Sequence, residues 1–196
     1  MEKFQTKLEE VINNTFEILR KNDSGSRIVF PTYRDSNHRV SEQELRFVFV
    51  EQVQGLLKEY DYYYSVETPT KDIYRFSQDK KYISPRIDES GKSASFDLSI
   101  VDKSNNTIAI IEFKAKNSDP HEYAKDLCKL WNPNEKSRYK YLLNLFEKID
   151  PRTKKHFFDK FDPSQNKWLE AKTSEEKVVV IAQSLRDTDE QIREEF

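Results

Sequence analysis

Two short apolar runs on either side of a polar turn constrain the fold of this chain more than any other feature. The first run, residues 96–100, reads Phe-Asp-Leu-Ser-Ile, and the second, residues 108–114, reads Ile-Ala-Ile-Ile-Glu-Phe-Lys. Asn105-Asn106 between them is a typical turn sequence, so we expect an antiparallel β-hairpin. The second run opens with four apolar residues, which is typical of a strand buried on both faces. The polar residues at the end of such a strand therefore need an explanation.

The polar end of this hairpin carries two carboxylates and a lysine. Asp97 lies near the start of the first strand, and Glu112 and Lys114 lie near the end of the second. Side chains two residues apart on a strand share a face, roughly 6–7 Å apart, so Glu112 and Lys114 point the same way. Because the strands run in opposite directions, Asp97 lies beside them at one edge. Carboxylate oxygens suit a hard divalent cation, so the cluster predicts a metal-dependent hydrolytic site.

The spacing of these residues resembles a known signature. Asp97, fourteen intervening residues and then Glu112-Phe113-Lys114 resemble the motif of the PD-(D/E)xK nuclease superfamily, which has the restriction-endonuclease-like fold. The proline that sometimes precedes the aspartate is Phe96 here. The alternative interpretation is an exposed hairpin on which Glu112 and Lys114 simply form a solvated ion pair.

The resemblance implies an activity and a cofactor. It implies hydrolysis of phosphodiester bonds in nucleic acid, with DNA as the expected substrate, Mg²⁺ as the cofactor and Mn²⁺ as a substitute. The main-chain carbonyl of Phe113 would join the Asp97 and Glu112 carboxylates as a metal ligand. Lys114 would orient or help deprotonate the attacking water, or stabilise the pentavalent phosphate.

The chain order of the predicted elements gives an α-β-β-β-α-β core. Apolar residues at helical spacing predict an amphipathic helix over residues 2–21, ahead of this core. The expected fold is therefore α/β, a mixed central sheet flanked by helices, with an added N-terminal helix. The expected domains are the helix and connecting loop at 1–40 and the nuclease-like domain at 41–196. The remaining predicted segments are a helix after Ser41, a strand over 62–67, a polar connection over 68–92, a helix from about Asp119, a strand over 139–146, a helix over 151–161, a strand over 178–182 and a charged tail over 187–196.

The helix after Ser41 can supply a further site residue. In an antiparallel meander the end of the first strand lies at the edge that holds Asp97, so the antiparallel helix before it begins beside the site. Glu44, in the first turn, is the expected additional catalytic residue and metal ligand. Glu42 and Glu51 are the alternatives, although Glu51 lies about 10 Å farther along the helix. A structural interpretation also stays open, in which Glu44 only closes a capping box with Ser41.

The polar connection over 68–92 is the expected nucleic-acid surface. It leaves the end of the first strand and should hang over the site, and its aromatic residues interleave with cations, a combination that can bind a phosphate backbone and stack on bases. The opposite interpretation is a solvated loop, because Asp72, Asp79, Asp88 and Glu89 nearly cancel its charge. The candidate contacts are Lys71, Arg75, Lys80, Lys81 and Arg86, with Lys116 after the hairpin.

Composition limits the other functional classes to which the chain could belong. The net charge of −2 excludes a global basic field, so contacts with phosphate must come from local patches or from a metal. The single cysteine, Cys128, falls in a helical pattern and is expected to be a buried thiol in a reducing compartment. His121 is expected to be an exposed histidine with no ligand role. No apolar run approaches the length of a membrane span, and we expect a soluble, cytoplasmic protein.

Three other functions stay open on the sequence alone. The first is a non-catalytic nucleic-acid-binding module of the same fold. The second is a nuclease subunit, in a homodimer or in a larger restriction, defence or mobile-element complex, which the helix over 2–21 could serve. The third is a metal phosphohydrolase with a small substrate, which the long basic connection makes less attractive.

Overall fold

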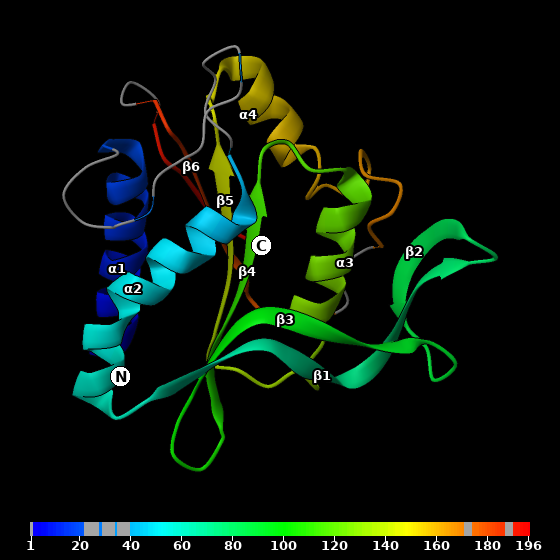
Figure 1. Ribbon diagram of the computed structural model, residues 1–196. Helices are drawn as coiled ribbons and strands as arrows, with labels where there is room; N and C mark the ends of the chain where they lie inside the picture. The colour runs from blue at the N-terminus through cyan, green and yellow to red at the C-terminus, as the bar shows by residue number, and fades with distance from the viewer. Residues whose placement is uncertain (1, 22–27, 29–33, 35–39, 171–173, 187–189) are drawn as a thin grey trace.

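The computed structural model describes residues 2–21, 28, 34, 40–170, 174–186 and 190–196. Its strands form one seven-stranded sheet in the order β2-β1-β3-β4-β5-β6-β7, with helices on both faces (Figure 1). The expected α/β class, the mixed sheet and the N-terminal helix are confirmed. The strands are β1 (Tyr63–Gln78), β2 (Lys81–Ile87), β3 (Lys92–Val101), β4 (Thr107–Ala115), β5 (Tyr139–Phe146), β6 (Val179–Ser184) and β7 (Ile192–Glu195).

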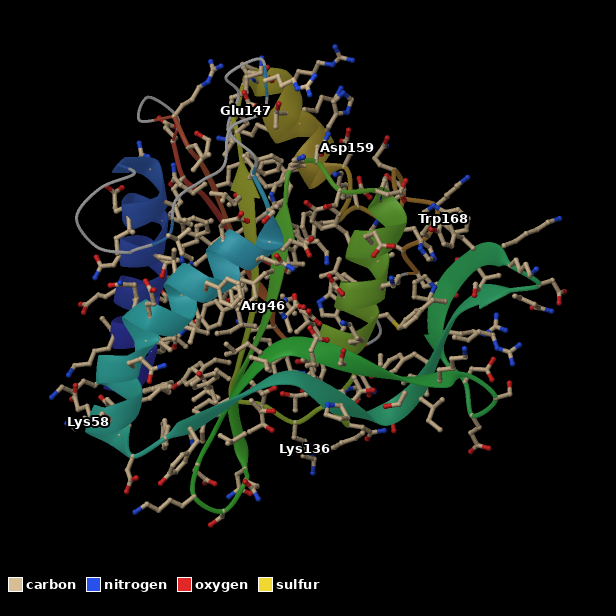
Figure 2. All side chains as sticks on the ribbon, in the orientation of Figure 1. Arg46, Lys58, Lys136, Glu147, Asp159 and Trp168 are labelled. Atoms are coloured by element: carbon tan, nitrogen blue, oxygen red, sulfur yellow. The ribbon has the colours of Figure 1, made fainter. Side chains whose placement is uncertain are left out.

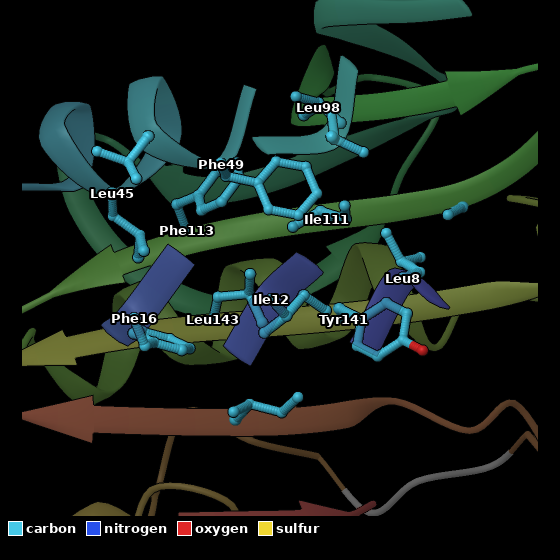
Figure 3. Close-up of a cluster of buried hydrophobic side chains, with 14 of the residues drawn as sticks. Leu8, Ile12, Phe16, Leu45, Phe49, Leu98, Ile111, Phe113, Tyr141 and Leu143 are labelled. Atoms are coloured by element: carbon cyan, nitrogen blue, oxygen red, sulfur yellow. The ribbon is translucent and has the colours of Figure 1, made fainter. Parts of the chain in front are cut away.

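Helices α1 (Glu2–Lys21) and α2 (Glu42–Tyr60) cover one face of the sheet. Their apolar stripes pack on alternate residues of the central strands, among them Ile111 and Phe113 of β4 (Figure 3). The intervening residues of each strand have side chains on the opposite face of the sheet, because side chains alternate along a strand. The N-terminal helix therefore belongs to the same hydrophobic core as the sheet.

Helices α3 (Pro120–Leu130) and α4 (Pro151–Phe158) cover the opposite face. The α3 stripe contains Tyr123, Leu127 and Leu130, and it packs with Ile110 of β4 in a second core cluster. The helix begins where Asp119, as N-cap residue, accepts a hydrogen bond from the main-chain N–H of His121 at 2.8 Å. The even-numbered residues of β4 therefore face α3, and Glu112 and Lys114 are two of them.

Strands β3 and β4 separate in the middle of the sheet. Their antiparallel register ends at the pair Leu98 and Ile111. Beyond this pair β3 continues beside β1, whereas β4 continues beside β5 as far as Ala115. No described strand pairs with this edge of β4 beyond Ile111, so the N–H groups there need other acceptors. The candidate site lies where β3 separates from β4, and we call this place the opening.

The expected polar connection over 68–92 is instead a β-hairpin, so that prediction was wrong. Strand β1 extends to Gln78 and pairs antiparallel with β2. Asp79 and Lys80 form the two-residue turn, with φ angles of 48° and 64°, which is the left-handed conformation that this kind of hairpin turn requires. The hairpin lies at the edge of the sheet, where strands accept charged residues on both faces. Charge alone is therefore a poor signal for a loop there.

Two smaller features also differ from the predictions. The charged C-terminal segment contains a strand, β7, which pairs antiparallel with β6 and buries Ile192. Ser41 precedes α2 as its N-cap residue, but its side chain makes no capping hydrogen bond to the described residues. The expected capping box is therefore absent. Most of the predicted connecting loop over 22–40 lies outside the described residues.

Candidate active site

The Asp97 carboxylate replaces the strand partner that β4 loses. Its Oδ2 atom accepts a hydrogen bond from the main-chain N–H of Phe113 at 2.8 Å. In return, the main-chain N–H of Asp97 donates to Oε2 of Glu112 at 3.3 Å. The side chains of Asp97 and Glu112 thus join β3 and β4 across the point of separation. The structure brings these two predicted site residues together, as the hairpin register required.

Glu42, at the start of α2, reaches the same edge of β4. Its Oε1 atom lies 4.0 Å from Nζ of Lys114. Side chains two residues apart on a helix point about 200° away from each other. Glu44, which is buried, therefore lies on the other side of α2 from Glu42. The preference for Glu44 is not supported by this geometry, and Glu42 is the helix glutamate at the site.

Helix α3 adds two buried charged residues that the sequence analysis did not select. Nζ of Lys114 lies 2.6 Å from Oδ2 of Asp126. Nζ of Lys129 lies 2.5 Å from Oε1 of Glu112 and 3.0 Å from Oδ1 of Asp126. We call Glu112, Lys114, Asp126 and Lys129 the ion network. Each of its four side chains is at most 10% exposed, so these are buried ion pairs rather than a solvated helix face.

Arg46 borders the opening from α2 (Figure 2). Its guanidinium pairs with Glu67 of β1 at 2.9 Å and lies 3.8 Å from Oδ1 of Asp97. The Asp97 side chain is 23% exposed and that of Glu42 is 44% exposed, whereas Glu112 is 2% exposed. The two solvent-accessible carboxylates of the site are therefore those of Asp97 and Glu42, and the ion network lies beneath them.

Burial and neighbouring charges set the protonation states within the ion network. Burial and the charge of Asp126 raise the pKa of Glu112, against the opposing effect of Lys129. Burial also raises the pKa of Asp126, but Lys129 and Lys114 outweigh it, and the net shift is downward. Burial lowers the pKa values of Lys114 and Lys129, but their carboxylate partners outweigh it, and both values are raised. Both lysines are therefore fixed positive charges at neutral pH.

The oxygen atoms at the opening are of the type that a hard cation prefers. The carboxylates of Asp97 and Glu42 are accessible, and the Phe113 carbonyl oxygen lies at the same edge of β4, 3.5 Å from Nζ of Lys114. Glu112 is less available, because Lys129 already occupies one of its oxygens. In the part of the chain that the structure describes, no three acidic, histidine or cysteine side chains are grouped as a metal site. The donors therefore match a hard cation in chemistry and exposure, but they do not form a preassembled set of ligands.

Five of the six predicted nucleic-acid contacts lie on β1, on β2 or in the turn between them, and Lys116 lies after β4. Arg75 and Arg86 both pair with Asp88, at 3.2 and 3.5 Å, which reduces their capacity to bind phosphate. Lys80 and Lys81 lie at the turn of the β1–β2 hairpin, which extends past α3 (Figure 1). Lys71 lies in β1, and Lys116, just after β4, is exposed with a φ of 62°.

His121 and Cys128, both on α3, are not site residues. His121 is buried, against expectation, because its Nε2 atom lies 3.0 Å from the Ile83 carbonyl oxygen and its ring stacks on Tyr82 at 4.2 Å. It attaches the β1–β2 hairpin to α3. Cys128 is half-buried and not fully buried as expected, and its burial raises the pKa of the thiol to about 12, so it stays protonated and unreactive.

Comparisons with protein-family models, with curated proteins and with solved structures found no match. The resemblance to PD-(D/E)xK nucleases therefore depends on Asp97, Glu112 and Lys114 and on their placement in β3 and β4. Over the described residues, no helix combines the length and the apolar character needed to cross a membrane.

Proposed function

We propose that this protein is a metal-dependent nuclease that hydrolyses phosphodiester bonds in nucleic acid, with DNA as the expected substrate. One observation carries the proposal: Asp97, Glu112 and Lys114 meet where β3 separates from β4, and the Glu42 carboxylate reaches the same opening. A phosphodiester is an anion with a poor leaving group, so its hydrolysis needs positive charge at the phosphate and an activated water molecule. Accessible carboxylates above a buried lysine suit both needs.

The exposure of the side chains suggests their roles. Asp97 and Glu42 would bind Mg²⁺ or Mn²⁺ at the opening, with the Phe113 carbonyl and Glu112 as further oxygen donors. The bound ion would supply Lewis-acid chemistry and a water molecule of lowered pKa. The pKa of Lys114 is raised by Asp126 and Glu42 in spite of its burial. This favours a charge-stabilising role for Lys114 over the role of a general base.

Substrate would approach across the β1–β2 hairpin. Lys80 and Lys81 at its turn and Lys71 in β1 are the cations that we propose for the phosphate backbone, with Lys116 nearer the end of β4. Arg75 and Arg86 would contribute less because of their shared partner Asp88. Each phosphate contact should make the affinity fall more steeply with salt concentration.

The ion network also favours a second candidate, a nucleic-acid-binding subunit of this fold that is inactive by itself. Lys129 pairs with Glu112 and with Asp126, and Lys114 pairs with Asp126. The buried charges thus compensate one another without a metal. In a subunit of a larger complex, a partner protein would complete the site or would replace it.

A cleavage panel separates the two candidates. Labelled DNA and RNA, duplex and single-stranded, are incubated with the full chain and either Mg²⁺ or Mn²⁺. The chain is compared with Asp97→Ala, with Lys114→Ala and with the control Lys103→Ala, which lies at the opposite end of the β3–β4 hairpin. Cleavage by the parent and the control alone supports the nuclease. Binding of nucleic acid without cleavage supports the subunit. A chain that neither cleaves nor binds nucleic acid contradicts both candidates.

A further inference from the structure

The ammonium group of Lys129 is held by as many acceptors as it has protons. It donates to Oε1 of Glu112 at 2.5 Å, to the Ser95 carbonyl oxygen at 2.8 Å, and lies 3.0 Å from Oδ1 of Asp126. A lysine ammonium has three N–H donors and no acceptor. Lys129 is also only 6% exposed. This side chain is therefore a fixed charge inside the site and not a mobile surface lysine.

The position of Lys129 limits what Glu112 can bind. Oε1 of Glu112 contacts Lys129, and Oε2 accepts the main-chain N–H of Asp97. Two-metal phosphodiesterases place their ions about 3.5–4 Å apart and need acidic side chains that serve both. Here the α3 side of Glu112 already has a positive charge. The open oxygen atoms lie on the other side, on Asp97 and Glu42.

The charge balance of the site also favours a single metal ion. The site contains four carboxylates, those of Glu42, Asp97, Glu112 and Asp126, and two ammonium groups, those of Lys114 and Lys129. Arg46 does not change this balance, because it pairs with Glu67. When all four carboxylates are ionised, two negative charges stay uncompensated, and one divalent cation would neutralise them.

We propose that Lys129 takes the place of a second metal ion, so that the site binds one divalent cation, at the Asp97 and Glu42 side. The inference rests on the proposed metal-dependent function and makes it more specific. Lys129 is a positioning residue that holds Glu112. The carboxylate of Asp126 in turn forms ion pairs with both Lys129 and Lys114. Helix α3 therefore sets the metal stoichiometry of the site.

The test measures Mn²⁺ stoichiometry on the full chain by isothermal titration calorimetry and by electron paramagnetic resonance. We expect one ion per chain for the parent and for Lys129→Arg, which keeps the charge. We expect two ions for Lys129→Gln, because removal of the ammonium frees Glu112 and adds a negative charge. Lys125→Gln is the matched control on the same helix, since Lys125 is 29% exposed and pairs with Glu122, and it should bind one ion.

Lys129→Gln removes a positive charge that compensates the carboxylates of Glu112 and Asp126, so this variant could unfold. Thermal unfolding with and without Mn²⁺ covers this case. If a metal ion replaces the lysine, Mn²⁺ must raise the melting temperature of Lys129→Gln more than it raises that of the parent. A variant that stays unfolded in saturating Mn²⁺, or that shows the same shift and stoichiometry as the parent, contradicts the inference.

The outcomes for the parent separate this inference from the proposed function. A parent that binds two ions, with cleavage, contradicts the role of Lys129 and leaves the nuclease standing. A parent that binds none contradicts the metal-dependent function itself. One ion in the parent and two in Lys129→Gln supports both.

Discussion

The main-chain N–H of Phe113 donates to the carboxylate of Asp97 across 2.8 Å, from β4 to β3. This contact lies just beyond Leu98 and Ile111, the last pair of the β3–β4 register. A side chain thus closes the edge of β4 that main-chain pairing leaves open. The same carboxylate is 23% exposed and faces the opening. Asp97 therefore has a structural and a proposed chemical role, and substitutions can separate the two.

Asp97→Asn and Asp97→Ala should differ in stability but not in metal binding. An asparagine oxygen can still accept the N–H of Phe113, whereas alanine leaves that group without its acceptor. We expect alanine to lower the free energy of unfolding by about 1–3 kcal/mol relative to asparagine, as measured by urea denaturation. Both variants should lose Mn²⁺ binding, because both remove the charge. Equal stability of the two variants would show that the hydrogen bond does not contribute.

The glutamates of α2 offer a direct comparison. Glu42→Gln should weaken Mn²⁺ binding about tenfold, a loss of about 1.4 kcal/mol, because the Glu42 carboxylate is at the opening. Glu44→Gln should leave the affinity unchanged, since Glu44 lies on the other side of the helix, and the exposed Glu51→Gln is a second control. Calorimetric titration measures all three. A loss of Mn²⁺ affinity in Glu44→Gln, without a loss in Glu42→Gln, would identify Glu44 as the metal ligand of α2.

Lys114 is expected to act on turnover and not on metal binding. As a buried charge, it would stabilise the negative charge that develops on the phosphate, and loss of such a group typically lowers the turnover rate about 10²–10³-fold. Lys114→Gln should therefore still bind Mn²⁺ and cleave that much more slowly. Single-turnover kinetics with Lys103→Gln as the control measures the effect. Loss of metal binding in Lys114→Gln would instead assign the lysine a structural role.

The parts of the fold that local patterns encode could be predicted from the sequence. The apolar runs and the turn of the β3–β4 hairpin are local features, and so is the strand β5, which spans Tyr139–Phe146 as expected. Strand β1 was predicted too short and β2 was missed, because edge strands tolerate charge and resemble loops in composition. The propensity and charge of residues indicate which residues are exposed, but they do not indicate which strands pair with each other.

The contribution of α3 to the site could not be predicted, because it depends on the register of that helix against the sheet. Asp126 and Lys129 meet Glu112 and Lys114, which lie 12 to 17 residues earlier in the chain. One signal was present: Asp126 lies three residues after Tyr123, on the buried stripe of α3. A carboxylate at such a position is rarely buried without a partner. The choice between Glu42 and Glu44 likewise depended on the face that α2 presents to β4.

The two described glycines should respond in opposite ways to alanine. A Cβ atom on Gly91, between β2 and β3, would collide with the main-chain carbonyl oxygen of Tyr74. Gly91→Ala should therefore lower the free energy of unfolding by about 1–3 kcal/mol. Gly55, on the exposed face of α2, has open space around it, and Gly55→Ala should raise stability by about 0.5–1 kcal/mol. Chemical denaturation of both variants checks the signs.

Lys160 should make stability depend on pH in the alkaline range. Its Nζ atom donates to Oδ1 of Asn117 at 2.6 Å, and burial lowers its pKa from 10.5 to about 8. Between these values the unfolded chain holds a proton that the folded chain has released, so the free energy of unfolding rises with pH. The slope from this group is at most about 1.4 kcal/mol per pH unit.

Lys160→Gln removes the titrating group and keeps a hydrogen-bond donor. The difference in free energy of unfolding between the parent and this variant should therefore change from pH 8 to pH 10.5 in favour of the parent. Urea denaturation at several pH values measures it. A constant difference across this range would mean that Lys160 keeps its proton in the folded protein.

The most direct test of the account is the Mg²⁺-dependent cleavage rate of labelled nucleic acid by the parent and by Asp97→Asn. Asp97→Asn removes the charge but keeps an oxygen atom that can accept the hydrogen bond from Phe113, so it should stay folded. We predict cleavage that requires Mg²⁺ or Mn²⁺ in the parent and none above background in the variant. Equal rates in the two proteins, or no metal-dependent cleavage by the parent on any substrate, would contradict the assignment of this opening as a nuclease active site.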